Sequence, residues 1–295
     1  MRTALSTLTV ARPRDLAHAL ALMSVGDGAV PPTPLAGGTD LLVYLNAGTY
    51  TGPGFLDLWG LRELRGVRAR KLGMTIGALT TFSEIREHAA LRRRFPALTA
   101  AAAEVGGRQI QNRATVAGNI ANASPAGDSL PALMALDAVV QARSVRGERG
   151  IPLGALYRGY RDLALSPDEL ITAVAIPFAP PRSVQFFRKV GTRRAQSISK
   201  VVMAGVLRLG RDGRVDHVRL AWGSVAPVTL LAGRAEEALL GAKPSRATAA
   251  QARAALMRDI APIDDIRSDH DYRLAVAGNV LEQFLRAADP RFARG

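Results

Sequence analysis

Two segments of the sequence combine small residues with polar groups in patterns suited to binding a polar ligand. The first spans residues 35–41 and places two adjacent glycines, Gly37 and Gly38, where the chain leaves an apolar stretch. Glycine permits positive φ and lets backbone N–H groups approach an anion without interference from a Cβ atom. Successive N–H groups there could hold a pyrophosphate, with the Thr39 hydroxyl as a further donor. Taken alone, the same pattern is also typical of a simple turn.

The second segment, residues 115–128, is richer in polar side chains. Small residues alternate with amides and hydroxyls, a composition suited to close contact with a polar ligand. Asp128 can accept two hydrogen bonds from a diol on a ribose or ribityl chain, while Asn119 and Ser124 can donate and accept. A long polar loop can instead simply be solvated. Two such segments in one α/β region favour a shared binding site.

The composition limits what chemistry the chain can perform by itself. The 295 residues include no cysteine, which excludes disulfides, a thiol nucleophile and any iron–sulfur cluster or cysteine-bound zinc held by this chain. The four histidines are isolated in sequence, so no metal site is predicted. Redox chemistry would therefore need a bound organic cofactor.

Three further properties bear on where the protein acts and on its partners. No stretch is apolar and long enough to span a bilayer, and residues 1–12 lack the pattern of a secretory signal. Together with the absence of cysteine, this predicts a cytoplasmic protein. The formal charge is +14, but the arginines are scattered and aromatic residues are few, which argues against nucleic-acid binding. A basic face for an acidic partner protein is favoured.

Periodicity and turn residues predict alternating helices and strands. Residues 108–122 contain too many turn-formers to favour a helix. The apolar run that starts at Ile171 ends in Ala179-Pro180-Pro181, which indicates a domain boundary. Helices are expected over residues 13–25, from residue 80 or 81, and over 97–105, 128–136, 232–240, 247–260 and 269–287; strands are expected over 55–58, 71–79, 139–144, 171–178, 201–209 and 215–224.

The order and spacing of the motifs resemble one protein family. The run Ala-Gly-Gly-Thr-Asp-Leu-Leu from Ala36 is followed by Ile-Gly-Ala-Leu-Thr-Thr from Ile76. Next come Gly118-Asn119, then Asn-Ala-Ser-Pro from Asn122, and Asp128. This arrangement is similar to that of the FAD-binding (medium) subunits of molybdopterin-containing hydroxylases, the xanthine dehydrogenase and carbon monoxide dehydrogenase family.

The resemblance implies an α+β protein with a vanillyl-alcohol-oxidase-type FAD-binding fold. Two small α/β subdomains, residues 1–58 and 59–178, would hold FAD, and residues 182–290 would form a C-terminal α+β domain with an antiparallel sheet and helices. Lys189 would approach the flavin and stabilise its anionic reduced form; the alternative is a surface lysine among arginines. The implied cofactor contacts are Leu35, Ala36, Gly37, Gly38, Thr39, Asp40, Leu41, Val105, Ala114, Thr115, Gly118, Asn119, Ala121, Ser124, Asp128, Ile171 and Lys189.

The resemblance also implies a role in electron transfer. A large partner subunit would carry molybdopterin and a small partner would carry [2Fe–2S] clusters, with NAD or another acceptor receiving the electrons. The xanthine dehydrogenase type is the first choice, and carbon monoxide, aldehyde or N-heterocycle dehydrogenases are alternatives. No catalytic residue is predicted on this chain. A stand-alone flavin reductase and a basic binding protein without cofactor are the hypotheses from other classes.

Overall fold

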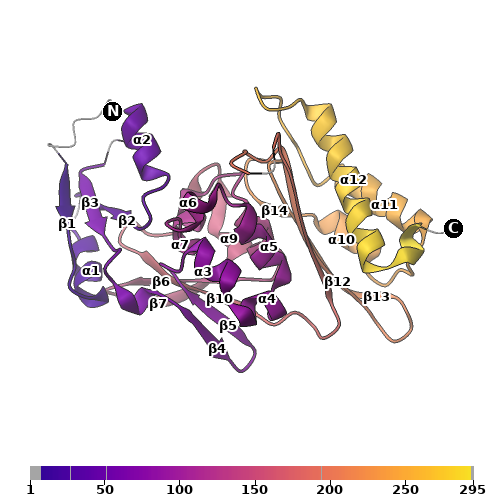
Figure 1. Cartoon of the computed structure of the whole chain (residues 1–295), viewed down its shortest axis with the longest axis horizontal. Helices are drawn as coiled ribbons and strands as arrows, with labels where there is room; N and C mark the ends of the chain where they lie inside the picture. The colour runs from indigo at the N-terminus through magenta and orange to yellow at the C-terminus, as the bar shows by residue number, and fades with distance from the viewer. Residues whose placement is uncertain (1–7, 27, 51, 194, 294–295) are drawn as a thin grey trace.

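A computed structural model describes residues 8–26, 28–50, 52–193 and 195–293 (Figure 1). The N-terminal part is a small sheet in the order β1-β3-β2, and both pairings are parallel. The loop between β2 and the following helix contains the glycine pair. The elements of this part are β1 (Thr9–Ala11), α1 (Leu16–Met23), β2 (Thr33–Leu35), α2 (Leu41–Ala47) and β3 (Gly54–Asp57).

The middle part is an antiparallel sheet in the order β4-β5-β10-β6-β7, with most of its helices inserted between β5 and β6. The first of these helices, α3, begins with a capping box, because Thr81 accepts from the Glu84 backbone N–H while Glu84 accepts from the Thr81 backbone N–H. The elements are η2 (Arg62–Leu64), β4 (Val67–Arg70), β5 (Gly73–Gly77), α3 (Phe82–Glu87), α4 (Ala89–Arg94), α5 (Pro96–Glu104), α6 (Arg108–Gln111), α7 (Val116–Asn122), α8 (Ser129–Ala135), β6 (Val139–Ser144), β7 (Gly147–Pro152), α9 (Leu153–Leu156), β8 (Tyr157–Gly159), β9 (Asp162–Leu163) and β10 (Leu170–Pro177).

The C-terminal part is an antiparallel sheet in the order β11-β12-β13-β14. Helices α10, α11 and α12 share a core with one face of this sheet, while α5 and α8 of the middle part pack against the other (Figure 1). Strand β12 is therefore buried on both faces: Val201 and Met203 belong to one core, and Ala204 and Val206 to the other. The elements are β11 (Val184–Val190), β12 (Val201–Leu209), β13 (Val215–Gly223), β14 (Leu230–Leu231), α10 (Gly233–Leu239), α11 (Arg246–Leu256), α12 (His270–Ala288) and η3 (Pro290–Ala293).

The observed architecture confirms the predicted α+β class. The three domain ranges stay a proposal, which gains support because the strands of each of these three sheets fall within one range. The prediction that residues 108–122 are not helical is wrong, since α6 and α7 lie there. Thr115 caps α7, and the burial of Val116 and Ile120 outweighs the weak helix propensity of Gly118.

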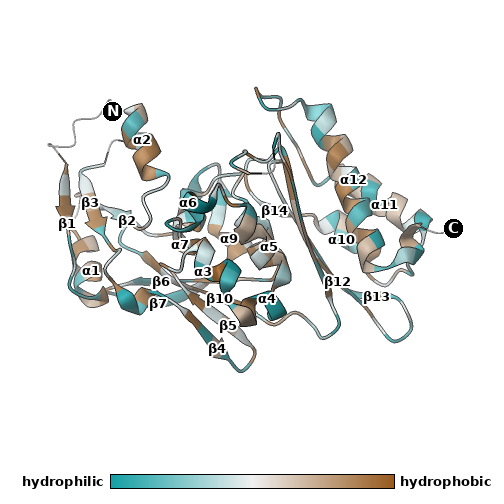
Figure 2. Cartoon of the chain, in the orientation of Figure 1, coloured by the Kyte–Doolittle hydropathy of each residue, from teal (hydrophilic) through white to brown (hydrophobic). Residues whose placement is uncertain are grey.

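Helix α2 exposes Leu42 and Val43, at 60% and 61% of their full area, and its brown stretch is visible in Figure 2. Among the described residues, no helix is both long and apolar enough to cross a membrane.

An ion pair tethers β7 to the segment before β10 and predicts a pH effect on stability. The Arg149 Nε lies 2.6 Å from Glu169 Oε1, and the Ser166 N–H donates to Glu169 Oε2 at 2.7 Å. The hydrogen bond from Arg149 lowers the pKa of Glu169 below its usual value of 4.5, although burial opposes this shift. A lowered carboxyl pKa stabilises the fold above the unfolded-state pKa, and the contribution is lost as pH falls through the folded pKa.

We therefore expect Glu169→Gln to lower the Tm by about 1–3 °C at pH 7. The gap between variant and wild type should close as the pH falls from 4.5 through the lower pKa of folded Glu169, because the wild-type carboxyl then becomes protonated as well. Thermal unfolding followed by circular dichroism at a series of pH values measures both effects. A gap that stays constant down to the lowest pH at which both proteins remain folded would show that shape, and not charge, explains the loss.

Candidate functional site

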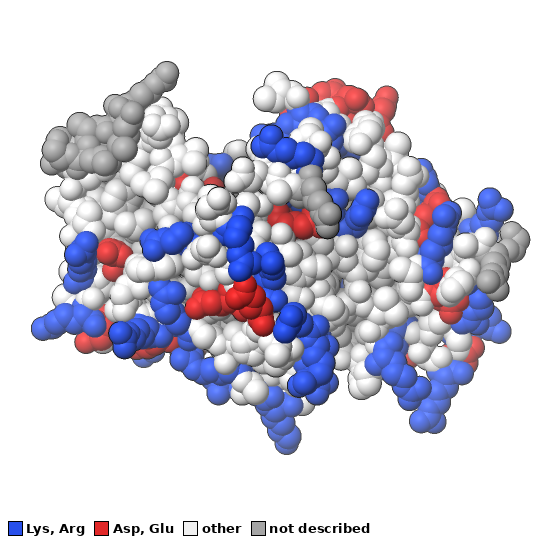
Figure 3. All heavy atoms as spheres, in the orientation of Figure 1, with Lys and Arg blue, Asp and Glu red and all other residues white. Residues whose placement is uncertain are grey.

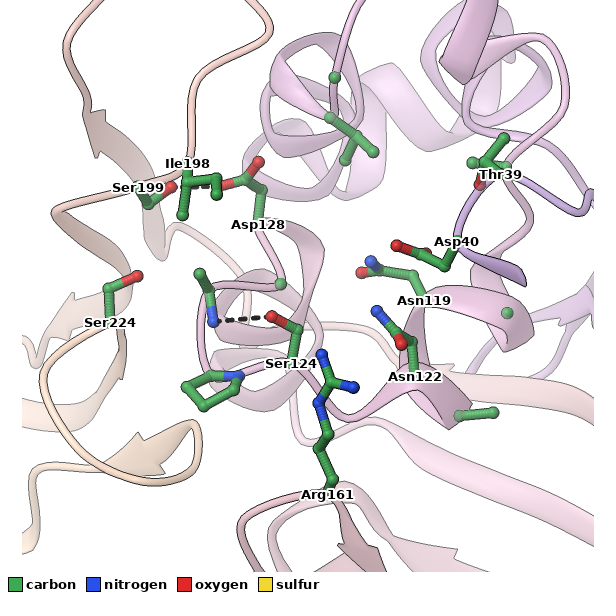
Figure 4. A pocket seen from close by; sticks show the side chains of 18 of the residues that line it. Thr39, Asp40, Asn119, Asn122, Ser124, Asp128, Arg161, Ile198, Ser199 and Ser224 are labelled. Atoms are coloured by element: carbon green, nitrogen blue, oxygen red, sulfur yellow. Dashed lines mark hydrogen bonds between the residues drawn. The ribbon is translucent and has the colours of Figure 1, made fainter. Parts of the chain in front are cut away.

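One large cavity, of about 1140 Å³, lies where the N-terminal glycine loop, the α7–α8 region and the C-terminal part meet (Figure 4). This volume exceeds the roughly 300–1,000 Å³ typical of sites for a single small ligand. The cavity is therefore large enough for an extended ligand such as a dinucleotide. The predicted contacts that line it are Ala36, Gly37, Gly38, Thr39, Asp40, Leu41, Val105, Ala114, Thr115, Gly118, Asn119, Ala121, Ser124 and Asp128.

The glycine loop forms one wall of the cavity and packs against the residues just before the second predicted segment. Gly38 has φ = 76°, a conformation that side chains rarely adopt. A Cβ atom on Gly37 would lie 1.9 Å from the carbonyl oxygen of Arg113. Only glycine therefore allows this contact between the loop and the residues that precede α7. Residues of both sequence segments line this one cavity.

Asp40 follows the glycine loop and projects into the cavity opposite Asn119 (Figure 4). It occupies the N-cap position of α2, but its side chain makes no capping hydrogen bond. Asp40 is exposed to solvent, but the cavity walls exclude part of the water that would otherwise surround its carboxylate. Burial raises the pKa of Asp40, and the positive charge of Arg161 partly offsets that rise.

Helix α7 supplies two amide side chains to the same wall. The Asn119 Oδ1 accepts from the Ser129 hydroxyl at 2.7 Å, and the Asn122 Oδ1 accepts from the Tyr44 hydroxyl at 2.7 Å. These internal bonds fix the carbonyl ends of both amides. The amide N–H groups of Asn119 and Asn122 have no protein partner in the described part of the chain and can donate to a ligand.

Asp128, just before α8, is held from two sides. The Lys189 Nζ donates to Asp128 Oδ2 at 2.7 Å and to the Glu104 carbonyl at 3.0 Å, while the Ser199 hydroxyl donates to Asp128 Oδ1. Burial raises the pKa of the Asp128 carboxyl, and the Lys189 charge opposes that rise. Each carboxylate oxygen keeps a further lone pair, so Asp128 can still accept from a ligand hydroxyl.

The other predicted contacts do not line the cavity. Lys189 is only 8% exposed and lies behind Asp128, so the alternative that it is a surface lysine is wrong. Leu35 ends β2 and pairs with Asp57, while Ile171 is buried in the main core. Their contacts with a cofactor stay predictions.

Several lining residues were not found from the sequence. Tyr44 and Arg161 belong to no motif, and Ser199 follows the cationic stretch without a signal of its own. The C-terminal wall contains Ser224 and Arg273, where the Arg273 Nη1 donates to the Ser224 carbonyl at 2.8 Å. The sequence did indicate Ser224, since it ends the strand expected over 215–224, at the stretch Trp222-Gly223-Ser224 that could face the flavin; its backbone is left-handed, with φ = 64°.

Comparison with known proteins explains this arrangement. Residues 6–179 match the family described as "FAD binding domain in molybdopterin dehydrogenase". The chain belongs to this family. Residues 186–288 match the family described as "CO dehydrogenase flavoprotein C-terminal domain". The protein is thus an FAD-binding oxidoreductase subunit of the molybdenum hydroxylase family.

Individual relatives extend along most of the chain. The xanthine dehydrogenase FAD-binding subunit of Escherichia coli O157:H7 is 32% identical over 86% of this chain and 87% of its own length. The nicotinate dehydrogenase FAD-subunit of Eubacterium barkeri is 35% identical over 72% of this chain and 73% of its own. A structure of carbon monoxide dehydrogenase from Hydrogenophaga pseudoflava superimposes with a TM-score of 0.92 at 27% identity, covering 99% of both chains.

The residues present fit FAD. The glycine loop exposes backbone donors where a Cβ atom would clash, and Asn119 and Asp128 offer a donor and an acceptor within the same large cavity. Within the described residues, no group of three or more His, Asp or Glu side chains could hold a metal ion. The site therefore suits an organic dinucleotide cofactor.

Proposed function

We propose that this subunit transfers electrons between [2Fe–2S] clusters on a small partner subunit and NAD or another acceptor. The complex would be a xanthine dehydrogenase-type molybdenum hydroxylase, in which a large partner holds molybdopterin. The observation that carries this proposal is the similarity to the xanthine dehydrogenase FAD-binding subunit over 86% of the chain. Bound FAD supplies the exchange between one-electron and two-electron carriers.

The role of this chain is to bind and orient the cofactor. We propose that backbone N–H groups of residues 36–39 hold the pyrophosphate. Asn119 would donate to the ligand through its amide, and Asp128 would accept from a hydroxyl of the sugar or ribityl chain. No side chain of this subunit needs to act as a general base, because substrate oxidation occurs on the partner.

A second substrate class is an N-heterocyclic carboxylate such as nicotinate. The nicotinate dehydrogenase FAD-subunit is 35% identical to this chain, although over a smaller share of it. Purines and nicotinate are both nitrogen heterocycles, so the two candidates share one reaction type. Carbon monoxide and aldehydes are the remaining candidate substrates of the complex.

Exposed apolar residues on and beside the cavity support partner docking. Tyr160, Ile198 and Ile263 line the cavity and are exposed, and Leu42 and Val43 are exposed on the neighbouring helix α2. Burial of such residues favours association. Lysines and arginines gather along β4, α4 and the β12–β13 hairpin on the face in Figure 3. A partner subunit with an acidic surface would be attracted to this basic edge.

We place the complex in the cytoplasm, and cell fractionation tests that placement.

Isolation of the native complex tests the proposal. The subunit is expected to be yellow and to co-purify with a large molybdenum-containing chain and a small chain with a [2Fe–2S] spectrum. Hypoxanthine, nicotinate, an aldehyde and carbon monoxide are then compared as electron donors, and NAD and dyes as acceptors. Turnover by the solitary flavoprotein would favour a stand-alone flavin reductase, and a colourless protein would favour the basic binding protein.

A further inference from the structure

One cation in the cavity has so far been described only through its effect on the Asp40 carboxyl. Arg161 lies in the turn between β8 and β9, with a left-handed backbone at φ = 56°. Its guanidinium reaches into the cavity between Ser124 and Asn122 (Figure 4). It also lines a second cavity of about 500 Å³ that shares Thr33 and Tyr44 with the first. Arg161 thus lies at the junction of two spaces.

The surroundings of Arg161 leave its guanidinium without an ion pair in the described part of the chain. Among the described residues it forms no ion pair, and its contacts are cation–π contacts with Tyr44 at 5.3 Å and Tyr160 at 5.6 Å. The other arginines of the cavity, Arg267 and Arg273, are both paired with Asp265. The guanidinium of Arg161 is therefore the lining cation, within the described chain, that remains available to an anionic ligand.

The wall formed by the glycine loop places a negative charge beside the proposed phosphate position. The glycine loop offers backbone N–H groups, but Asp40 at its end carries a negative charge that repels a phosphate. The charge of Arg161 already acts on Asp40, since it offsets part of the rise that burial causes in the Asp40 pKa. A planar guanidinium can donate two parallel hydrogen bonds to phosphate oxygens. It also carries a full positive charge, which the backbone N–H groups of the loop do not.

We propose that Arg161 binds the diphosphate of the bound dinucleotide from the side opposite the glycine loop. The inference rests on the proposed FAD binding and names the residue that compensates the charge of the diphosphate. The cation–π contacts with Tyr44 and Tyr160 help to hold the side chain in place. The β8–β9 hairpin, which has no part in the FAD motifs, thereby becomes part of the cofactor site.

Titration of the full-length, flavin-free chain with FAD and with riboflavin tests this proposal. Arg161→Gln is expected to weaken FAD binding about 10- to 100-fold, the effect of losing a hydrogen bond to a charged group. Riboflavin has no phosphate, so its affinity should not change. Added salt should weaken FAD binding less in the variant than in the wild type. Flavin fluorescence measures each affinity.

Two further variants make the test specific. Arg158→Gln removes an arginine from the same hairpin, where it is paired with Asp162, and should leave FAD affinity unchanged. Arg161→Lys keeps the charge without the planar fork, so we expect a loss of a few fold; it also serves if Arg161→Gln does not fold. Unchanged FAD affinity in both Arg161 variants, or an equal loss of FAD and riboflavin, overturns the inference. Wild-type protein that binds no FAD overturns the proposed function itself.

Discussion

Gly37→Ala is expected to remove most of the FAD from the purified protein. The new Cβ atom would lie 1.9 Å from the Arg113 carbonyl oxygen. Because that oxygen belongs to the backbone, rotation of a side chain cannot relieve the clash. The glycine loop must shift away from the segment that leads into α7, and the backbone donors lose their positions. Overpacking of this kind also lowers the free energy of unfolding by about 1–3 kcal/mol. The ratio of flavin to protein absorbance and a urea titration measure the two effects.

Gly60→Ala is the matched control for this variant. Nothing lies within 4 Å of a Cβ atom at Gly60, so the same methyl group should leave FAD content and stability near those of the wild type. If Gly37→Ala retains wild-type FAD content, the glycine loop does not hold the cofactor in the way we propose.

Asp128→Ala is expected to cause the second large effect, on both stability and FAD content. It leaves the Lys189 ammonium buried without its carboxylate, a change that typically costs about 3–5 kcal/mol. It also removes an acceptor from the cavity wall. The free energy of unfolding of the FAD-free protein and the affinity for FAD should both fall.

The double variant Asp128→Ala/Lys189→Met separates these two effects. Removing both charges should recover much of the stability, because no unpaired charge remains buried. FAD affinity should stay low if Asp128 accepts from the cofactor; recovery of wild-type affinity would mean that Asp128 acts only through the fold. Asp216→Ala, which removes a carboxylate paired with Arg208 on the exposed face of β13, is the control and should cost less than about 1 kcal/mol.

The elements that the sequence predicted best are those with strong local signals. The β12–β13 hairpin and α12 carry clear alternation or helical periodicity, and their observed bounds agree closely with the expected ones. Local signals failed at α7, where Gly118 and Asn119 resemble a loop. The buried face of that helix, which includes Ile120, stabilises it only once the rest of the core is present.

The residues of the candidate site likewise divide into those with a local sequence signal and those without one. Residues 36–41 and 115–128 were found because each forms a continuous motif, and both line the cavity. Arg161 and Ser199 reach it from separate hairpins and loops, and no local pattern marks them. The ion pair between Lys189 and Asp128 joins residues 61 positions apart, so their pairing depends on the fold and not on spacing.

The double burial of β12 has a consequence for how proteins of this kind can diverge. Ala204 and Val206 belong to the same core as α8, the helix that begins directly after Asp128. Substitutions on this strand must therefore be matched by substitutions on a helix that precedes it by some 70 positions. We expect residues 6–179 and 186–288, which match the two families, to be inherited together. A recombinant that joins residues 1–181 to the C-terminal segment of a distant relative should fold poorly, even though the junction falls in an exposed, proline-rich connection.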